Sequence, residues 1–121
     1  MNTALVVDDS RTDLEIVSRF LTQQGLDVMT ATNGEETLAM LAQHKPDLVV
    51  LDVVLPDLSG FELCRHIKED DSTSQIPVII CSTKGTEMDK FWGMKQGANA
   101  YLEKPIDNME FSDTVKKLLR I

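Results

Sequence analysis

Apolar residues follow two alternating patterns along the chain. In the first, short runs are almost purely apolar, strongest at residues 4–7, 48–51 and 78–81 and weaker at 28–31 and 100–102. Such unbroken runs are typical of strands that are buried on both faces of a parallel sheet. In the second, apolar side chains recur at helical spacing, as in the sets Leu14, Val17, Phe20, Leu21 and Phe111, Val115, Leu118.

Three more helices are expected around residues 38–41, 63–67 and 86–96, the last of them weakened by Gly93. Gly25 and Gly97 stand where two of the helices should end. A strand followed by a helix, repeated five times, predicts a (βα)₅ chain. Right-handed crossovers then cover both faces of the sheet with helices, which gives a doubly wound α/β domain. We expect the whole chain, residues 1–121, to form this single domain with no output domain attached.

The charge balance narrows the choice of partners. The chain has 12 Lys and Arg against 20 Asp and Glu residues, a net charge of −8. This charge opposes binding to a phosphate backbone, so nucleic acid is not expected as a partner, whereas basic surfaces and divalent cations are. The chain also has no apolar run long enough to insert into a membrane, and it has no secretory leader. We therefore expect a cytoplasmic protein.

Chemically active side chains follow four of the predicted strands. Because ligands of doubly wound sheets bind beyond the carboxyl ends of the strands, these side chains should converge at one edge. They are, in chain order, Asp8 and Asp9, Asp52, Ser82 or Thr83, and Lys104. Only one of the hydroxyls of Ser82 and Thr83 is expected at the site, and the distance from Pro77 favours Ser82.

Three carboxylates in one cleft repel one another unless a cation lies between them. Carboxylate oxygens without His or Cys favour Mg²⁺, with Mn²⁺ as an alternative, and the backbone carbonyl of Val54 is placed to complete the set. Asp52 is then the natural nucleophile, forming an acyl phosphate. Mg²⁺, the Lys104 ammonium and the Ser82 hydroxyl would each neutralise one phosphoryl oxygen.

A simpler interpretation exists for the first acidic pair. Ser10 and Asp13 have the spacing of a capping box, in which each side chain binds the backbone of the other at a helix N-terminus. We expect Ser10 to be a helix cap, but a cap does not account for both Asp8 and Asp9.

Four motifs resemble those of response-regulator receiver domains of the CheY type. They are "DD" at 8–9, "LDVVLPDLSGFEL" around Asp52, "PVIICST" and "YLEKP", and they occur in the family's order over the whole chain. The resemblance implies a flavodoxin-like three-layer sandwich with strand order 2-1-3-4-5. It also implies that Asp52 accepts a phosphoryl group from a CheA-like or other histidine kinase, or from a phosphotransfer domain. The metal site would comprise Asp8, Asp9, Asp52 and the Val54 carbonyl.

The resemblance also implies a switch. Ser82 would be the switch hydroxyl, Tyr101 the rotating aromatic ring and Lys104 the phosphate-binding lysine, with a cis peptide bond before Pro105. Phosphorylation would then change the surface formed by the fourth helix, fifth strand and fifth helix, where a downstream protein binds. Such a protein is not an enzyme with an external substrate, because it catalyses only its own phosphorylation and dephosphorylation.

Residues 75–89 and 89–107 resemble the stand-alone PilH-type receivers of type IV pilus twitching motility and taxis systems, with Trp92–Gly93 as the most distinctive feature. We therefore expect a monomer that acts in a chemotaxis-like pathway, either as its output or as a phosphate sink. Two alternatives stay open. One is an aspartate-nucleophile, Mg²⁺-dependent phosphatase or phosphotransferase, although Val54 stands where such enzymes have an acid. The other is an interaction scaffold that is never phosphorylated.

Overall fold

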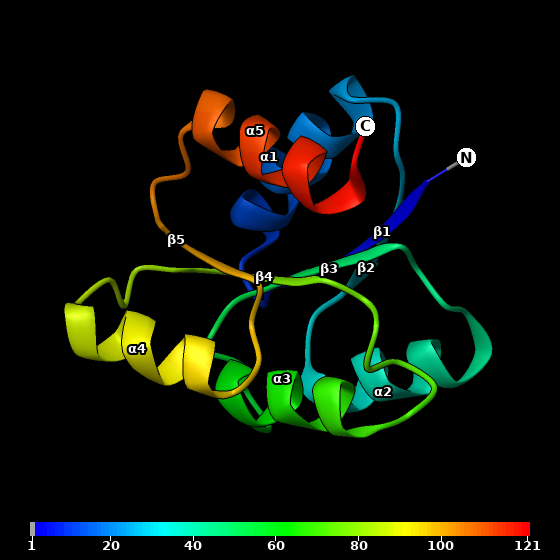
Figure 1. The fold of residues 1–121 in the computed structure, drawn as a ribbon, viewed down its shortest axis with the longest axis vertical. Coiled ribbons are helices and arrows are strands. Elements are labelled where there is room, and N and C mark those ends of the chain that lie inside the picture. The colour runs from blue at the N-terminus through cyan, green and yellow to red at the C-terminus, as the bar shows by residue number, and fades with distance from the viewer. Residues whose placement is uncertain (1) are drawn as a thin grey trace.

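The computed structural model describes residues 2–121 and contains five parallel strands and five helices in strict alternation. The sheet has the order β2-β1-β3-β4-β5, as expected from the sequence. The elements are β1 (Thr3–Val7), α1 (Arg11–Gln23), β2 (Asp27–Ala31), α2 (Gly34–Gln43), β3 (Leu48–Leu51), α3 (Gly60–Glu69), β4 (Val78–Ser82), α4 (Glu87–Lys95), β5 (Ala100–Glu103) and α5 (Asn108–Leu119) (Figure 1).

Every apolar run predicted as a strand is one, but four of the five strands are one residue longer than their run. The additional residues are polar: Thr3, Asp27, Ser82 and Glu103. They extend the pairing of neighbouring strands, because Thr3 lies opposite Asp27 and Ser82 lies opposite Glu103. A hydrophobic pattern cannot detect residues that join a sheet through their backbone alone.

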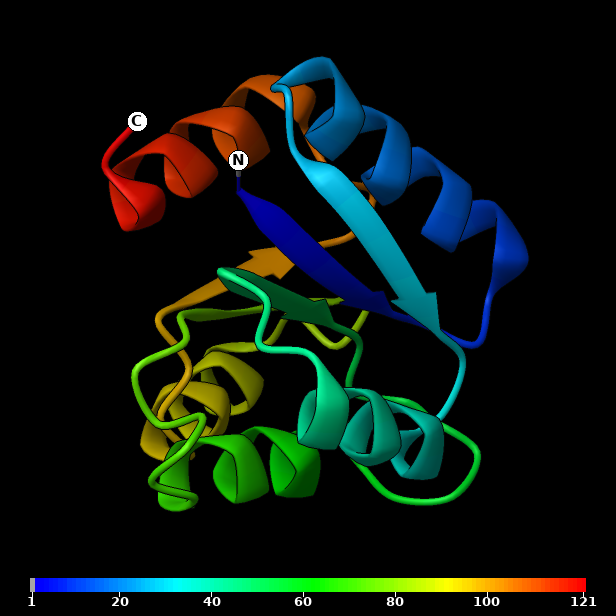
Figure 2. The same cartoon turned by 90° about the vertical axis from the view of Figure 1, so that its right-hand side faces the viewer.

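Two hydrophobic layers lie on opposite faces of the sheet. Helices α1 and α5 cover one face, and α2, α3 and α4 cover the other (Figures 1 and 2). Alternate residues of β1 supply the two layers: Ala4 and Val6 pack with the α1–α5 side, whereas Leu5 and Val7 pack with the α2–α3 side. The central strands are thus buried on both faces, which explains their unbroken apolar runs.

Each helix begins at a capping side chain that accepts a backbone N–H of the first turn: Ser10, Asn33, Ser59, Thr86 and Asp107. Ser10 is therefore a cap, but the predicted capping box with Asp13 is wrong. The Ser10 backbone N–H donates to Asp8 Oδ1 at 2.9 Å, which leaves the Asp13 carboxylate free for another contact. The reciprocal box forms instead in α4, between Thr86 and Asp89.

Glycines end two helices and allow one close packing contact. Gly25 and Gly97 have φ values of 87° and 102°, in the left-handed region that favours glycine at a helix C-terminus. Gly93 lies inside α4, where a Cβ atom would be 2.7 Å from Cδ2 of Tyr101. The glycine that weakens α4 as a helix therefore makes room for the Tyr101 ring.

Backbone hydrogen bonds hold the chain segments that follow the strands in fixed positions. Asp8 N–H donates to the Ala31 carbonyl, and Asp52 N–H donates to the Val7 carbonyl, at 3.1 and 3.0 Å. Lys104 N–H donates to the Ser82 carbonyl at 2.9 Å. The first residue beyond each of these strands is thereby fixed at one edge of the sheet. Within residues 2–121, no helix has the length and apolar character needed to cross a membrane.

We expect Gly60→Ala to destabilise the fold more than Gly34→Ala, although both glycines are the first residue of a helix. A Cβ on Gly60 would lie 2.0 Å from the backbone oxygen of Asp52, whereas one on Gly34 would meet the side chain of Leu58. Backbone cannot yield as a side chain can, so the expected losses in unfolding free energy are about 2–3 and about 1 kcal/mol. Urea denaturation measures both, and equal losses would contradict this account.

Candidate functional site

Three carboxylates meet at the carboxyl edge of the sheet, as the sequence predicts. Asp8 and Asp9 follow β1, and Asp52 follows β3. Each offers an oxygen, and the three oxygens lie within 4.8 Å of one another. Asp8 is buried, Asp52 is partly buried and Asp9 is exposed, so the cluster is open to solvent on one side.

The ammonium of Lys104 lies against this cluster. Its Nζ is 2.7 Å from Asp8 Oδ2, 3.2 Å from Asp52 Oδ2 and 2.8 Å from Asp13 Oδ2. The Lys104 side chain is only 9% exposed. The peptide bond from Lys104 to Pro105 is cis, as expected.

The charges at this edge are poorly solvated. Burial raises the pKa of Asp8, and the hydrogen bond from Lys104 opposes that rise without cancelling it. Burial also lowers the pKa of Lys104, but hydrogen bonds to Asp13 and Asp8 outweigh burial, so its pKa is raised overall. The cluster is therefore a place where an additional cation would relieve unfavourable charge.

The donor set fits a hard divalent cation. The three clustered ligand atoms are all carboxylate oxygens, which Mg²⁺ and Mn²⁺ prefer. Mg²⁺ retains several waters, and the exposed side at Asp9 leaves room for them. Beside the cluster, the Val54 backbone N–H is 3.5 Å from Asp52 Oδ1, so the backbone of Val54 adjoins the acceptor carboxylate. The role of the Val54 carbonyl stays a prediction.

Ser82 and Tyr101 are connected through one loop residue. Ser82 is the last residue of β4 and fully buried, whereas Thr83 is exposed, which favours Ser82 as the hydroxyl at the site. Ser82 Oγ accepts the backbone N–H of Lys84 at 3.2 Å, and the Tyr101 hydroxyl donates to the carbonyl of the same residue. The loop after β4 thus bonds to both predicted switch residues.

The Tyr101 ring is held against the protein. It packs on the α2–α3 side of the core and against Gly93 of α4. Burial raises the pKa of Tyr101 to about 12, so the hydroxyl is protonated and available as a donor at neutral pH.

Comparison with known protein families shows to which family this fold and site belong. Residues 4–116 match the model of the response regulator receiver domain. The chain belongs to the response-regulator receiver family. Over 98% of its length, this receiver is 43% identical to protein PilH of Pseudomonas aeruginosa and covers 98% of that protein. Some other relatives are longer: the chain is 37% identical to the phosphate regulon regulator PhoB of the same organism and spans 52% of its length.

Solved structures agree with the family. A putative response regulator from Chloroflexus aurantiacus superposes with a TM-score of 0.95 at 33% identity, covering 99% of this chain and 98% of that one. The chemotaxis response regulator CheY4 of Vibrio cholerae gives a TM-score of 0.90 at 29% identity, with 98% and 99% of the two chains covered. The predicted family, CheY-like fold and PilH-type resemblance are therefore confirmed. Receivers are phospho-accepting signalling domains that bind Mg²⁺ at an acidic pocket, and this receiver has the acidic cluster.

Sequence analysis missed the contact between Asp13 and Lys104. It assigned Asp13 to a capping box, whereas the side chain extends from the first turn of α1 to the lysine. Its position one helical turn after Asp9, in a helix that starts at the site, was the available signal.

Sequence analysis also missed Asp57, which attaches the loop after Asp52 to α2. Its two oxygens accept the backbone N–H groups of Gly34 and Glu35, both at 2.8 Å. These hydrogen bonds lower the pKa of Asp57. The Asp57 carboxylate thus binds N–H groups at the start of α2 that have no partner within the helix. It also holds the loop that follows Asp52 in place.

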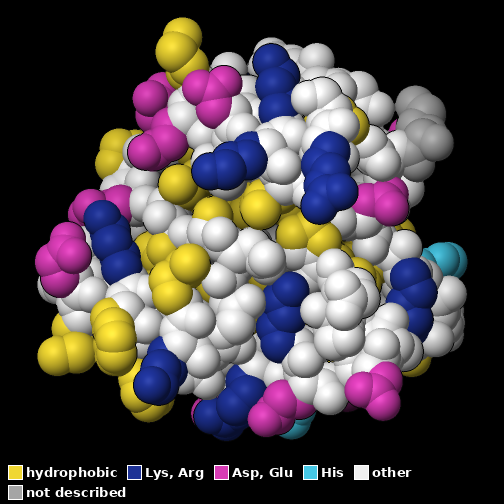
Figure 3. Space-filling model, viewed as in Figure 1, with side chains coloured by type: hydrophobic (Ala, Val, Ile, Leu, Met, Phe, Trp, Pro, Cys, Tyr) yellow, Lys and Arg dark blue, Asp and Glu magenta, His cyan; other side chains and the backbone are white. Residues whose placement is uncertain are grey.

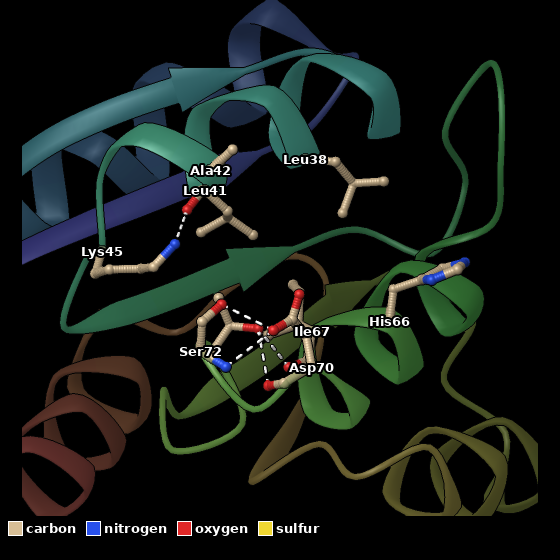
Figure 4. A pocket seen from close by; sticks show the side chains of 9 residues that line it. Leu38, Leu41, Ala42, Lys45, His66, Ile67, Asp70 and Ser72 are labelled. Carbon is tan, nitrogen blue, oxygen red and sulfur yellow. Dashed lines mark hydrogen bonds between the residues drawn. The ribbon is translucent and has the colours of Figure 1, made fainter.

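A cavity of about 200 Å³ between α2 and α3 is separate from the carboxylate cluster (Figure 4). Three of its polar side chains, Lys45, Asp70 and Ser72, have partners in the protein. Lys45 donates to the Leu41 carbonyl, and Asp70 accepts from the backbone and hydroxyl of Ser72. The charged side chains that line the cavity, Lys45 and Asp70, therefore bond within the chain, and we assign the receiver's chemistry to the sheet edge.

We expect Mg²⁺ to stabilise the receiver and Asp9→Asn to remove most of that effect. A ligand that binds only the folded state adds about 2.7 kcal/mol at one hundred times its dissociation constant. Asp9 is exposed, so its substitution should not disturb the fold. Thermal unfolding with and without Mg²⁺ tests this, with Asp27→Asn, another exposed aspartate, as the control. Equal stabilisation of all three proteins would contradict the assigned site.

Proposed function

We propose that Asp52 accepts a phosphoryl group from the phosphohistidine of a CheA-like or other histidine kinase, or of a phosphotransfer domain. The observation that supports this most is the position of Asp52 beside both the acidic pair and Lys104. Its Oδ1 accepts the Val53 backbone N–H at 2.7 Å, while its Oδ2 contacts Lys104. Oδ2 is therefore the oxygen nearest the charge that stabilises an added phosphoryl group.

The transfer conserves atoms and charge in a simple way. An Asp52 oxygen forms a bond to phosphorus as the bond from phosphorus to the histidine nitrogen breaks, and the departing imidazole takes up a proton. Lys104 and the buried hydroxyl of Ser82 are the side chains available to bind the phosphoryl oxygens. Asp8, Asp9, Asp52 and the Val54 carbonyl would hold Mg²⁺. Bound there, Mg²⁺ supplies positive charge beside a phosphoryl oxygen.

The hydrogen bonds of Lys84 supply a route from the site to the surface. If the Ser82 hydroxyl turns to a phosphoryl oxygen, the Lys84 N–H loses its acceptor and the loop after β4 is free to move. The same residue's carbonyl holds the Tyr101 hydroxyl, so that movement would release the ring. Phosphorylation of Asp52 would in this way change the surface of α4, β5 and α5.

That surface carries apolar side chains suited to binding a protein partner. The exposed set on α4 is Met88, Phe91, Trp92 and Met94. In Figure 3 hydrophobic side chains gather at the lower left, over α4. Exposed apolar residues concentrated on one helix are typical of a binding surface.

We infer that the receiver acts as a cytoplasmic, monomeric signalling protein of the PilH type, and its 43% identity to PilH over 98% of both chains supports a role of that type. The pathway would be chemotaxis-like signalling or type IV pilus twitching motility, with the receiver as output or as phosphate sink. Its only catalysis would be its own phosphorylation and dephosphorylation. A phosphatase of the aspartate-nucleophile class is less well supported, because the exposed Val54 offers no acid two residues after Asp52.

Acetyl phosphate should add one phosphoryl group to the protein in the presence of Mg²⁺, and Asp52→Asn should abolish this gain. Intact-protein mass spectrometry measures it, with Asp27→Asn as the matched control because Asp27 is an exposed aspartate outside the cluster. Labelling of Asp52→Asn equal to that of the unmodified protein would contradict the assignment. Multiple turnover of p-nitrophenyl phosphate would favour the phosphatase instead.

The single tryptophan, Trp92, should report the switch, because its side chain lies on α4 and is 48% exposed. We expect Mg²⁺ with beryllium fluoride, a phosphoryl mimic, to change its fluorescence. The change should be absent in Asp52→Asn and reduced at least twofold in Ser82→Ala. An unchanged spectrum in the unmodified protein, under conditions where mass spectrometry shows phosphorylation by acetyl phosphate, would contradict coupling of Asp52 to α4.

A further inference from the structure

Lys104 has one carboxylate partner that is not part of the acidic cluster. Asp8 and Asp52 belong to the group whose oxygens can hold a metal ion, whereas Asp13 does not. The Lys104 to Asp13 contact, at 2.8 Å, is nevertheless nearly as short as that to Asp8, at 2.7 Å. The lysine is therefore held from two sides, by the cluster and by helix α1.

The start of α1 is built so that Asp13 can reach the lysine. The Ser10 hydroxyl accepts the Asp13 backbone N–H at 3.3 Å and fixes this residue in the first turn. Because Asp8 takes the Ser10 backbone N–H, the Asp13 carboxylate has no capping partner to bind and extends to Lys104. Its side chain is 35% exposed, whereas that of Lys104 is 9% exposed.

Phosphorylation of Asp52 would weaken the other two contacts of the lysine, those to Asp52 and Asp8. Once a phosphoryl group is attached to Asp52, that carboxylate becomes part of an acyl phosphate. Asp8 is one of the proposed metal ligands, so its charge is then shared with a cation. Asp13 alone keeps a full negative charge for the ammonium, which has three N–H donors and can bind Asp13 and phosphoryl oxygens together.

Resting on the proposed function of Asp52, we propose that Asp13 is a positioning residue, which holds the Lys104 ammonium toward the phosphoryl group during transfer. Its charge also has an opposing effect, because a carboxylate repels the anionic phosphodonor. Solvent screens that repulsion at a partly exposed side chain, whereas a displaced lysine loses a direct contact with the transferring group. Positioning is therefore the larger effect.

The test is the rate of phosphorylation by acetyl phosphate with Mg²⁺, followed by intact-protein mass spectrometry. We expect Asp13→Ala to slow phosphorylation about tenfold. Asp13→Glu keeps the carboxylate, so it should slow phosphorylation no more than about threefold. The control is Glu15→Gln, which removes an exposed charge from the same helix and should not change the rate more than twofold.

A double-mutant cycle separates positioning from a structural role. In a Lys104→Met background, Asp13→Ala should slow the reaction no further, because the group that it positions is absent. An unchanged or faster rate in Asp13→Ala, or an equal loss in both backgrounds, would overturn the proposal. A protein with native Asp13 and Lys104 that acquires no phosphoryl group would instead count against the proposed function itself.

Discussion

Repulsion among carboxylates at the carboxyl edge of the sheet is the constraint on which this receiver depends. Asp8, Asp9 and Asp52 are brought within one cluster by backbone hydrogen bonds that continue beyond the strands, so the fold itself imposes the unfavourable charge. Lys104 offsets part of this charge and is held by the cluster in return. An acidic pair at the end of a buried strand is thus stable only with cations beside it, which is the chemistry that phosphoryl transfer requires.

The same arrangement connects the site to the rest of the molecule through few contacts. Asp57 attaches the loop after Asp52 to α2, and Lys84 bonds to Ser82 on one side and to Tyr101 on the other. Gly93 lets the Tyr101 ring lie against α4. A change at the sheet edge therefore has a short path of hydrogen bonds and packing to the apolar surface of α4.

Much of this could be predicted from the sequence, because parallel strands give unbroken apolar runs and their carboxyl ends meet at one edge. The alternation of strands and helices, the acidic cluster and the Ser10 cap follow from such local patterns, whereas the strand order was implied by the resemblance to receiver domains. The predicted box between Ser10 and Asp13 was wrong in one of its two hydrogen bonds. Asp8 binds the Ser10 backbone N–H, and the Asp13 carboxylate binds Lys104, which is 91 residues away in the sequence. Asp57 was missed for a related reason: its partners are backbone N–H groups more than 20 residues away, which no side-chain pattern marks.

On phosphorylation, Lys104 is expected to exchange a carboxylate of the cluster for the phosphoryl group. A crystal structure with Mg²⁺ and beryllium fluoride bound at Asp52 tests it most directly. The account predicts that Nζ leaves Asp8, keeps Asp13 and contacts a fluorine, while the Ser82 hydroxyl turns from Lys84 to the mimic. A structure in which Lys104 stays on Asp8 and makes no contact with the bound mimic would contradict it.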